Sequence, residues 1–242
     1  MKTERLVLRK WTETDADSLF EYAKNPEVGP VAGWPPHKSV EESKEVIRNV
    51  FNAPECYAIC EKENNIAIGA VELKLNGHTD MTQRDDECEL GYWLGQPFWG
   101  KGYMPEAARE LLRHGFEDLG MTTIWCGYYD GNQKSERVQQ KLGFVFHHTC
   151  SEVPVPLLNE VRVEHTNIMT KSIGRKYVAA NHIVLIKKEF YAFVYFCFFG
   201  AKSFMPGIAP PATAQKYRLA TLQYGLNLRR YFSNSLRSIF LW

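Results

Sequence analysis

The sequence lacks the patterns that would place it among metal-binding, secreted or membrane-spanning proteins. Its six cysteines form no Cys-x-x-Cys pair and no cysteine–histidine set at zinc-finger spacing, so we expect no metal site. No apolar signal-peptide region follows Met1. The apolar run Phe190–Phe199 has ten residues, which is too short to cross a bilayer. We therefore expect a cytoplasmic protein with reduced thiols and no transmembrane span.

Acidic residues are almost absent from the last part of the chain, and this divides the chain in two. Residues 172–242 contain ten Lys or Arg side chains and one acidic residue, Glu189, whereas residues 1–171 carry a net charge of about −8. A mildly acidic body is not typical of a nucleic-acid binder. We expect residues 1–171 to form one domain that binds no nucleic acid, and residues 172–242 to form a separate basic tail rich in aromatic residues.

Hydrophobic periodicity predicts strands and helices in residues 1–171. The expected strands are Leu6–Leu8, Cys56–Glu61, Ile66–Leu75, Glu87–Leu94, Thr122–Tyr129, Phe144–Thr149 and Val161–Met169. The expected helices are Ala16–Ala23 with Thr14 or Asp15 as N-cap, Ser39 to about Asn52, Pro105–Leu119 and Gln133–Leu142. A run of antiparallel strands followed by a strand–helix–strand unit predicts an α/β protein, in which helices cover both faces of a mixed, twisted sheet.

The densest chemical signal is a glycine-rich segment at residues 91–107. It places a strand-like Gly-Tyr-Trp-Leu run before a turn that contains Gly100 and Gly102, and the turn leads into a helix. Glycines let a backbone approach a ligand closely, and the free N–H groups of a first helical turn attract phosphate. The segment does not match a Walker loop. It does not match Gly-x-Gly-x-x-Gly either, since residue 105 is proline. Taken alone, it is more often a tight turn that binds no ligand.

A second segment, residues 132–144, reads Asn-Gln-Lys-Ser-Glu-Arg-Val-Gln-Gln-Lys-Leu-Gly-Phe. Taken singly, Asn132 is an ordinary helix N-cap and Ser135 a solvated helix residue. Together with the Trp-Gly-Lys-Gly-Tyr turn at residues 99–103, the segment resembles the GNAT N-acetyltransferases. The closest likeness is to the branch that contains the ribosomal-protein alanine N-acetyltransferases and spermidine N-acetyltransferase. The resemblance covers about residues 3–170.

The resemblance implies a GNAT fold of about seven strands and an N-acetyltransferase that uses acetyl-CoA as co-substrate. The acetyl-CoA residues that it implies are Trp93, Leu94, Trp99, Gly100, Lys101, Gly102, Tyr103, Met104, Asn132 and Ser135. In this family a backbone N–H of the strand that holds Trp93 and Leu94 stabilises negative charge on the thioester oxygen. Met104 replaces the small residue that usually ends the loop, so we expect it to narrow the approach of the cofactor.

The same resemblance implies direct attack of an amine on the thioester, and the amine must first lose a proton. Glu89 is the candidate base, because strand alternation puts it on the same face as Gly91 and Trp93. An ion-paired strand glutamate would give the same sequence, Glu72 and Glu87 are alternative bases, and a water-mediated route needs none of them. Ser135 is the candidate that protonates the leaving thiolate.

The expected acceptor is a small-molecule or peptide amine, such as a protein N-terminus or a polyamine. Its contacts are expected from Trp34, His37, Glu89 and Tyr92, since this family places its first inter-helix loop, here Trp34-Pro35-Pro36-His37, at the acceptor site. The alternative function is a catalytically weak CoA-binding module that acts through protein interaction. The sequence leaves open which amine is used and whether the protein is a monomer or a homodimer.

The basic tail, residues 172–242, has three interpretations. It is an extension that touches membrane or RNA, a docking segment for an apolar surface, or sequence without selected function. Its composition lacks alternation and helix-capping signals, which favours the last of these.

Overall fold

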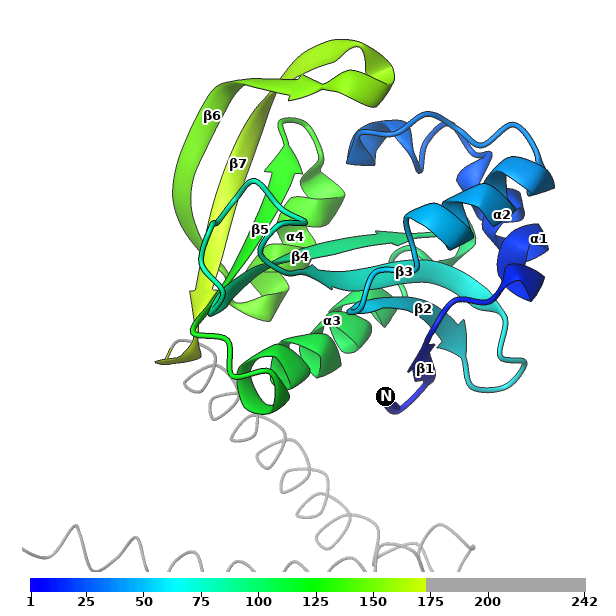
Figure 1. The fold of residues 1–242 in the computed structure, drawn as a ribbon, viewed down its shortest axis with the longest axis horizontal. Coiled ribbons are helices and arrows are strands. Elements are labelled where there is room, and N and C mark those ends of the chain that lie inside the picture. Colours follow the sequence, from blue (N-terminus) through cyan, green and yellow to red (C-terminus); the bar gives the residue numbers. More distant parts are fainter. Residues whose placement is uncertain (173–242) are drawn as a thin grey trace, which may run out of the picture. The chain divides into compact units, whose positions relative to one another are not determined.

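The computed structural model describes residues 1–172, and the predicted tail lies outside these residues. Its seven strands are β1 (Leu6–Arg9), β2 (Cys56–Glu61), β3 (Ala67–Lys74), β4 (Glu87–Leu94), β5 (Thr123–Tyr129), β6 (Val145–Val155) and β7 (Glu160–Thr170). They form one sheet in the order β1-β2-β3-β4-β5-β7-β6, in which β4 and β5 are parallel and the other neighbours antiparallel (Figure 1). The mixed sheet predicted from the sequence is confirmed.

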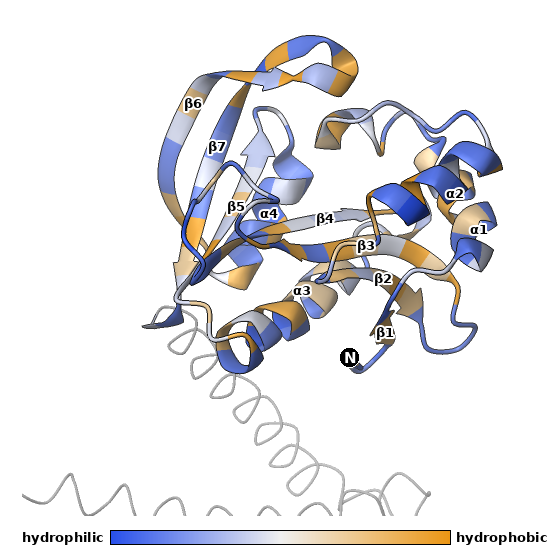
Figure 2. Cartoon of the chain, in the orientation of Figure 1, coloured by the Kyte–Doolittle hydropathy of each residue, from blue (hydrophilic) through white to orange (hydrophobic). Residues whose placement is uncertain are grey.

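Four α-helices cover the two faces of this sheet. They are α1 (Ala16–Ala23), α2 (Val40–Asn49), α3 (Tyr103–Arg113) and α4 (Gln133–Leu142). α1 and α2 pack on one face over β2 and β3, and α3 and α4 pack on the other. Figure 2 shows hydrophobic stretches of β3 beside an α2 whose visible surface is mainly hydrophilic. The division agrees with two separate apolar cores, one on each face.

Alternation along the strands gives the sheet two chemically different faces. The Tyr92 face packs on α3 and α4 and carries apolar residues such as Leu90, Leu94 and Ile124. The Glu89 face packs on α1 and α2 only at the β1–β3 end. By the strand register, the Glu89 face also carries Glu72, Lys74, Trp93, Gly127 and Glu164.

Two helix starts follow local capping. The Ser39 hydroxyl accepts a hydrogen bond from the Glu42 N–H at 3.1 Å, so α2 begins at its predicted cap. The N-cap of α1 is Asp15, one of the two residues that the sequence predicted, although its side chain makes no capping hydrogen bond to this helix. A 3₁₀ turn at Glu13–Asp15 precedes this helix, and the Thr12 N–H donates to the Asp15 carboxylate at 2.9 Å. Thr12 therefore caps this 3₁₀ turn, and the turn leads through Asp15 into α1.

α3 differs from its predicted range, Pro105–Leu119, at both ends. It begins at Tyr103, directly after Gly102 with a φ of 78°, and proline is tolerated in a first helical turn. It ends at Arg113 and continues as a π-helical turn, His114–Asp118. The apolar spacing that predicted a longer helix is preserved through this turn, because Phe116 stays buried in the core.

Candidate active site

β4 leaves part of its backbone without a neighbouring strand. β4 and β5 pair only from Glu87 to Glu89, opposite Thr123 to Trp125, and beyond this point the two strands run in different directions (Figure 1). The Gly95 N–H donates to the Ile68 carbonyl of the β3 side at 2.8 Å. Alternate residues of an antiparallel strand bond the same neighbour.

It follows that Gly91 and Trp93 also turn their N–H groups towards β3. The N–H groups of Tyr92 and Leu94 then point to the β5 side, beyond the end of the ladder. The Leu94 carbonyl accepts from the Trp99 indole N–H at 2.7 Å. Of the two residues that the sequence assigned to this role, Leu94 and not Trp93 presents its N–H to the open side.

The turn before α3 has the conformation that its glycines predicted. Gly100 and Gly102 have φ values of 75° and 78°, a region that other residues rarely adopt. Within residues 1–172, no acceptor takes a hydrogen bond from the N–H of Gly100, Lys101 or Gly102. These groups and the first turn of α3 present free donors in one short stretch, which fits a pyrophosphate.

The Arg5 side chain holds this turn in place, and sequence reasoning did not single this residue out. Its Nη1 donates to the Lys101 carbonyl at 3.0 Å and its Nε to the Glu106 carboxylate at 2.7 Å. Burial opposes the charge on Glu106, yet hydrogen bonds from Thr3 and Arg5 hold the pKa of that carboxyl below its usual value. Arg5 therefore ties the carbonyl of the turn to the first turn of α3.

Two side chains of the turn do not face a ligand. Met104 is only 5% exposed and packs in the apolar core of the Tyr92 face, so the expectation that it narrows the cofactor approach is wrong. Tyr103 directs its hydroxyl to the Glu61 carboxylate at 3.1 Å. In the described part of the chain, only the backbone N–H groups of these two residues remain free at the start of α3.

α4 brings the second predicted segment beside the first. The Asn132 side chain accepts from the Ser135 N–H at 3.2 Å and donates to the Val31 carbonyl at 3.1 Å. It thus caps α4 and also fixes the loop between α1 and α2. Lys134 Nζ lies 3.7 Å from the centre of the Trp99 ring, which links the start of α4 to the glycine-containing turn.

Ser135 belongs to a buried polar network on the Tyr92 face. Its hydroxyl lies 2.9 Å from the Tyr92 hydroxyl, and Gln139 Nε2 donates to it at 3.2 Å. Gln139 is itself bonded to the Gly127 carbonyl and to Asn167 of β7. Burial raises the pKa of Tyr92 well above its usual value, so its hydroxyl stays protonated. The structure therefore groups Tyr92 with Ser135 and not with Glu89.

Glu89 lies on the predicted face but is fully engaged. Its carboxylate accepts from Lys74 Nζ at 2.7 Å and from the Thr79 hydroxyl at 2.5 Å, and the residue is buried. Burial opposes the charge on Lys74, but its contacts with Glu89 outweigh burial and raise its pKa. Lys74 therefore keeps its positive charge beside the Glu89 carboxylate.

Glu164 of β7 is a further carboxylate of this face that sequence reasoning missed. Burial raises its pKa to about 7, the charges of Glu89 and Asp80 reinforce the rise, and Lys74 opposes it. A Cβ atom on Gly127 would lie 2.5 Å from Glu164 Oε1. A glycine inside a strand often marks such a close approach, and Gly127 was the one sequence signal available.

The loop between α1 and α2 lies over the same face. Trp34 meets Trp93 edge-on with ring centres 5.9 Å apart. His37 Nδ1 lies 2.8 Å from the Ser43 hydroxyl, and burial lowers the pKa of His37. Arg162 of β7 donates to the Pro30 carbonyl at 2.6 Å, so the loop is held against β7.

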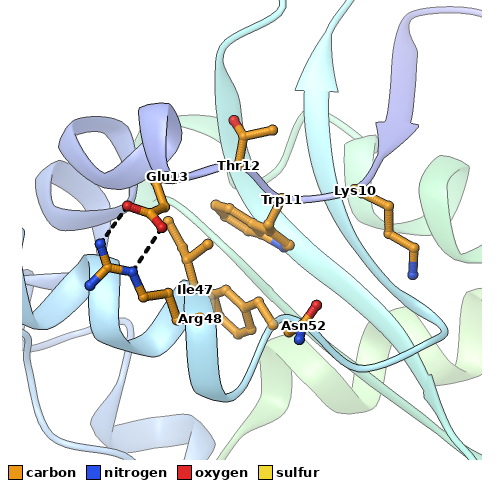
Figure 3. Close-up of a pocket in the computed structure, with 8 residues that line it drawn as sticks. Lys10, Trp11, Thr12, Glu13, Ile47, Arg48 and Asn52 are labelled. Atoms are coloured by element: carbon orange, nitrogen blue, oxygen red, sulfur yellow. Dashed lines mark hydrogen bonds and ion pairs between the residues drawn. The ribbon is translucent and has the colours of Figure 1, made fainter.

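A cavity of about 420 Å³ lies away from these groups, between the end of β1 and α2. It is lined by Lys10, Trp11, Thr12, Glu13, Ile47, Arg48, Phe51 and Asn52. Figure 3 shows the two hydrogen bonds that the Arg48 guanidinium donates to the Glu13 carboxylate beside the Trp11 ring. It contains none of the residues predicted to bind acetyl-CoA or an amine.

Within residues 1–172, no group of three or more His, Cys, Asp or Glu side chains is placed to hold a metal ion. None of the helices described is long and apolar enough to cross a membrane.

Comparison with known proteins gives a family model and relatives. A model described as an acetyltransferase (GNAT) domain matches residues 5–145, more than half of the chain. The uncharacterized N-acetyltransferase p20 of Bacillus licheniformis is 31% identical over 147 residues, which cover 59% of this chain and 80% of the relative. The residues that the family model matches, 5–145, contain the glycine-containing turn and all of α4.

Solved structures share the fold. An acetyltransferase of the GNAT family from Bacillus anthracis superimposes with a TM-score of 0.61 at 22% identity, over 71% of this chain and 98% of that one. A ribosomal-protein-S5-alanine acetyltransferase from Vibrio fischeri gives a TM-score of 0.56 at 20% identity, over 70% and 95% of the two chains. At these identities the likeness concerns the fold alone.

Proposed function

The chain belongs to the GNAT acetyltransferase family, and from this premise we propose that it moves an acetyl group from acetyl-CoA to a primary amine by direct attack. The family resemblance of the sequence is thereby confirmed, and the protein is an N-acetyltransferase. The proposal adds the acceptor class: a protein N-terminus, a polyamine or another small amine. The observation that supports acetyl transfer from acetyl-CoA is the end of the β4–β5 ladder. Open backbone N–H groups lie there between the two predicted cofactor segments.

The residues divide into a cofactor side and an acceptor side. We assign the pyrophosphate to the N–H groups of residues 100–104 and the thioester oxygen to the Leu94 N–H. Ser135, supported by Tyr92, is assigned to the leaving sulfur. Acetyl-CoA supplies an activated acetyl thioester. The protein's own contribution is to orient this group, to stabilise negative charge on its oxygen and to handle two protons.

The acceptor side is assigned to the Glu89 face. Trp34 and His37 lie on the loop that covers this face, and Glu72, Glu89 and Glu164 bring negative charge to it. This combination supports an acceptor that arrives as a cation, as primary amines do at neutral pH. It argues against an anionic acceptor.

The cofactor assignment is tested by Gly102→Val. A side chain at this left-handed position should keep the backbone from a pyrophosphate and weaken acetyl-CoA binding about 30-fold, the effect of losing one hydrogen bond to a charged group. Isothermal titration with acetyl-CoA measures the change. Gly120→Val is the matched control, because Gly120 has a φ of 75°, has no atom within 4 Å of its Cβ position and lies beyond the other end of α3.

Unchanged affinity in a folded Gly102→Val variant would contradict the loop assignment. The acceptor class is tested by thiol release from acetyl-CoA with spermidine and with peptides that begin with Ala, Ser or Met. Tight acetyl-CoA binding without amine-dependent thiol release would favour the alternative, a binding module without turnover.

A further inference from the structure

We propose that Glu164 takes the proton from the acceptor amine, which approaches over the Glu89 face; this inference rests on the proposed function. The geometry at the end of the β4–β5 ladder carries it. Two glycines, Gly91 in β4 and Gly127 in β5, lie just beyond the last paired residues. A carboxylate from the next strand lies over each of them.

These two carboxylates are Glu72 and Glu164. A Cβ atom on Gly91 would lie 2.8 Å from Glu72 Oε1, and one on Gly127 would lie 2.5 Å from Glu164 Oε1. A Cβ at either position would displace the carboxylate, whereas glycine lets it lie directly over the strand. Both acids are therefore held beside the place where the two strands separate and where the N–H groups of β4 are open.

Four glutamates of this face could accept a proton, and their partners distinguish them. Glu89 is bound by Lys74 and Thr79. Glu87 accepts from the Trp125 indole at 2.7 Å and from the Thr82 hydroxyl at 2.8 Å.

Burial raises the pKa of Glu72 as well, but the charge of Lys74 opposes the rise and the Glu72 carboxylate accepts from the Cys56 thiol. No donor within residues 1–172 forms a hydrogen bond to the Glu164 carboxylate. A carboxylate oxygen that already accepts from a protein donor is less available to a substrate ammonium. Glu164 is thus the carboxylate of this face whose oxygens remain available to a substrate ammonium.

Its surroundings also suit a base that works near neutral pH. The titratable and charged groups that face it from the packed elements are Lys74 of β3, Asp80 of the β3–β4 loop, Glu89 of β4 and Tyr129 of β5. Burial and the two neighbouring carboxylates raise the pKa of Glu164 to about 7, against the opposing charge of Lys74. A base is most effective when its pKa lies near the working pH.

The ammonium of the acceptor gives one proton to the Glu164 carboxylate, and the neutral nitrogen forms a bond to the acetyl carbon. The carbon–sulfur bond breaks, and the second proton of the nitrogen ends on the sulfur as the thiol leaves. Glu164 then releases its proton to solvent. The products are the N-acetylated amine, the thiol form of CoA and one proton.

The test is Glu164→Gln in the full chain, with kcat/KM measured by thiol release between about pH 5.5 and 9. The probes are acetyl-CoA and whichever of spermidine and the Ala-, Ser- or Met-initiated peptides is acetylated fastest. Wild type should rise with pH to a plateau with a midpoint near pH 7, because only the deprotonated carboxylate accepts a proton. The variant should be about 100-fold slower at pH 7 and should lack this midpoint.

Three matched variants complete the experiment. Glu152→Gln changes an exposed glutamate of β6 and should behave as wild type. Glu72→Gln and Glu89→Gln should retain an acidic limb. The proposal is overturned if Glu164→Gln keeps the wild-type midpoint and a rate within about twofold, or if the limb disappears in Glu72→Gln or Glu89→Gln instead.

A second readout needs neither turnover nor acetyl-CoA. In protein labelled with ¹³C at the glutamate carboxyl, one resonance should titrate near pH 7 and should be missing in Glu164→Gln. A missing resonance that titrates below about pH 5 would overturn the proposal. If wild type releases no thiol with any amine, the proposed function fails as well; if wild type is active and Glu164→Gln equals it, only the role of Glu164 fails.

Discussion

The cofactor side and the acceptor side of this site are built in different ways. The cofactor side comes from two continuous segments, residues 99–104 and 132–135, each of which ends a turn and begins a helix. Apart from the loop that holds Trp34 and His37, the acceptor side comes from single residues of β3, β4, β5 and β7, such as Glu72 and Glu164, which meet only through strand register. A continuous segment can be recognised in a sequence, whereas residues that depend on register need the sheet to be known.

The first prediction tests whether the ion pair of Lys74 with Glu89 stabilises the acceptor side. Lys74→Met leaves the Glu89 charge without its partner, and Glu89 is 10% exposed in its side chain while Lys74 is 34% exposed. Breaking a fully buried pair costs about 3–5 kcal/mol. Since a third of Lys74 meets solvent, we expect the free energy of unfolding to fall by about 2 kcal/mol, measured by urea denaturation.

The control for this variant removes both charges. Lys74→Met combined with Glu89→Leu leaves no unpaired charge, so it should recover most of the loss. Lys24→Met is the surface control: it breaks an exposed pair with Glu21 and should change stability by less than about 0.5 kcal/mol. A Lys74→Met variant as stable as the surface control would show that the pair does not hold the acceptor side together.

The second prediction addresses the cofactor side. Ser135→Ala should lower kcat about tenfold if its hydroxyl protonates the leaving sulfur, and acetyl-CoA affinity should change by less than about twofold. Ser151→Ala, an exposed serine of β6, is the matched control and should be neutral. Equal losses in kcat and in acetyl-CoA affinity would instead indicate that Ser135 only binds the cofactor.

The sequence predicted the elements of both sides well. The ranges Glu87–Leu94 and Gln133–Leu142 agree with β4 and α4 residue by residue, because turn residues mark their ends. Asn132 and Gly143 bound α4, and Gly143 adopts the left-handed conformation typical of a helix C-terminus. The glycine-containing turn was predicted for the same reason: its chemistry depends on consecutive residues.

The roles of single strand residues could not be predicted in this way. Residues 160–165 alternate between charged and apolar side chains until His165, which is typical of a half-exposed strand. This pattern does not distinguish the exposed Glu160 from the half-buried Glu164. The difference arises from the pairing of β7 with β5 and from the space above Gly127. Arg5 was missed for a similar reason, because it lies 96 residues before Lys101 in the sequence and meets it only in the fold.

The last and smallest expected effect concerns residues 172–242, and it asks whether residues 1–171 supply both sides of the site alone. β7 ends at Thr170, and the Lys171 N–H still donates to the Thr122 carbonyl at 3.0 Å, so a chain that ends at Lys171 keeps every strand and helix described here. The charges of the two parts, about −8 and +9, attract each other, but such surface attraction is weak and screened by salt.

We therefore expect the truncated chain to bind acetyl-CoA and to turn over within about twofold of the full chain in 0.15 M salt. It should also be more soluble, because it lacks the uncharged apolar run Phe190–Phe199. Gel filtration, acetyl-CoA titration and thiol release check these three properties. Precipitation of the truncated chain, or loss of acetyl-CoA binding, would mean that residues beyond 171 complete the domain and that the boundary expected at Lys171 is misplaced.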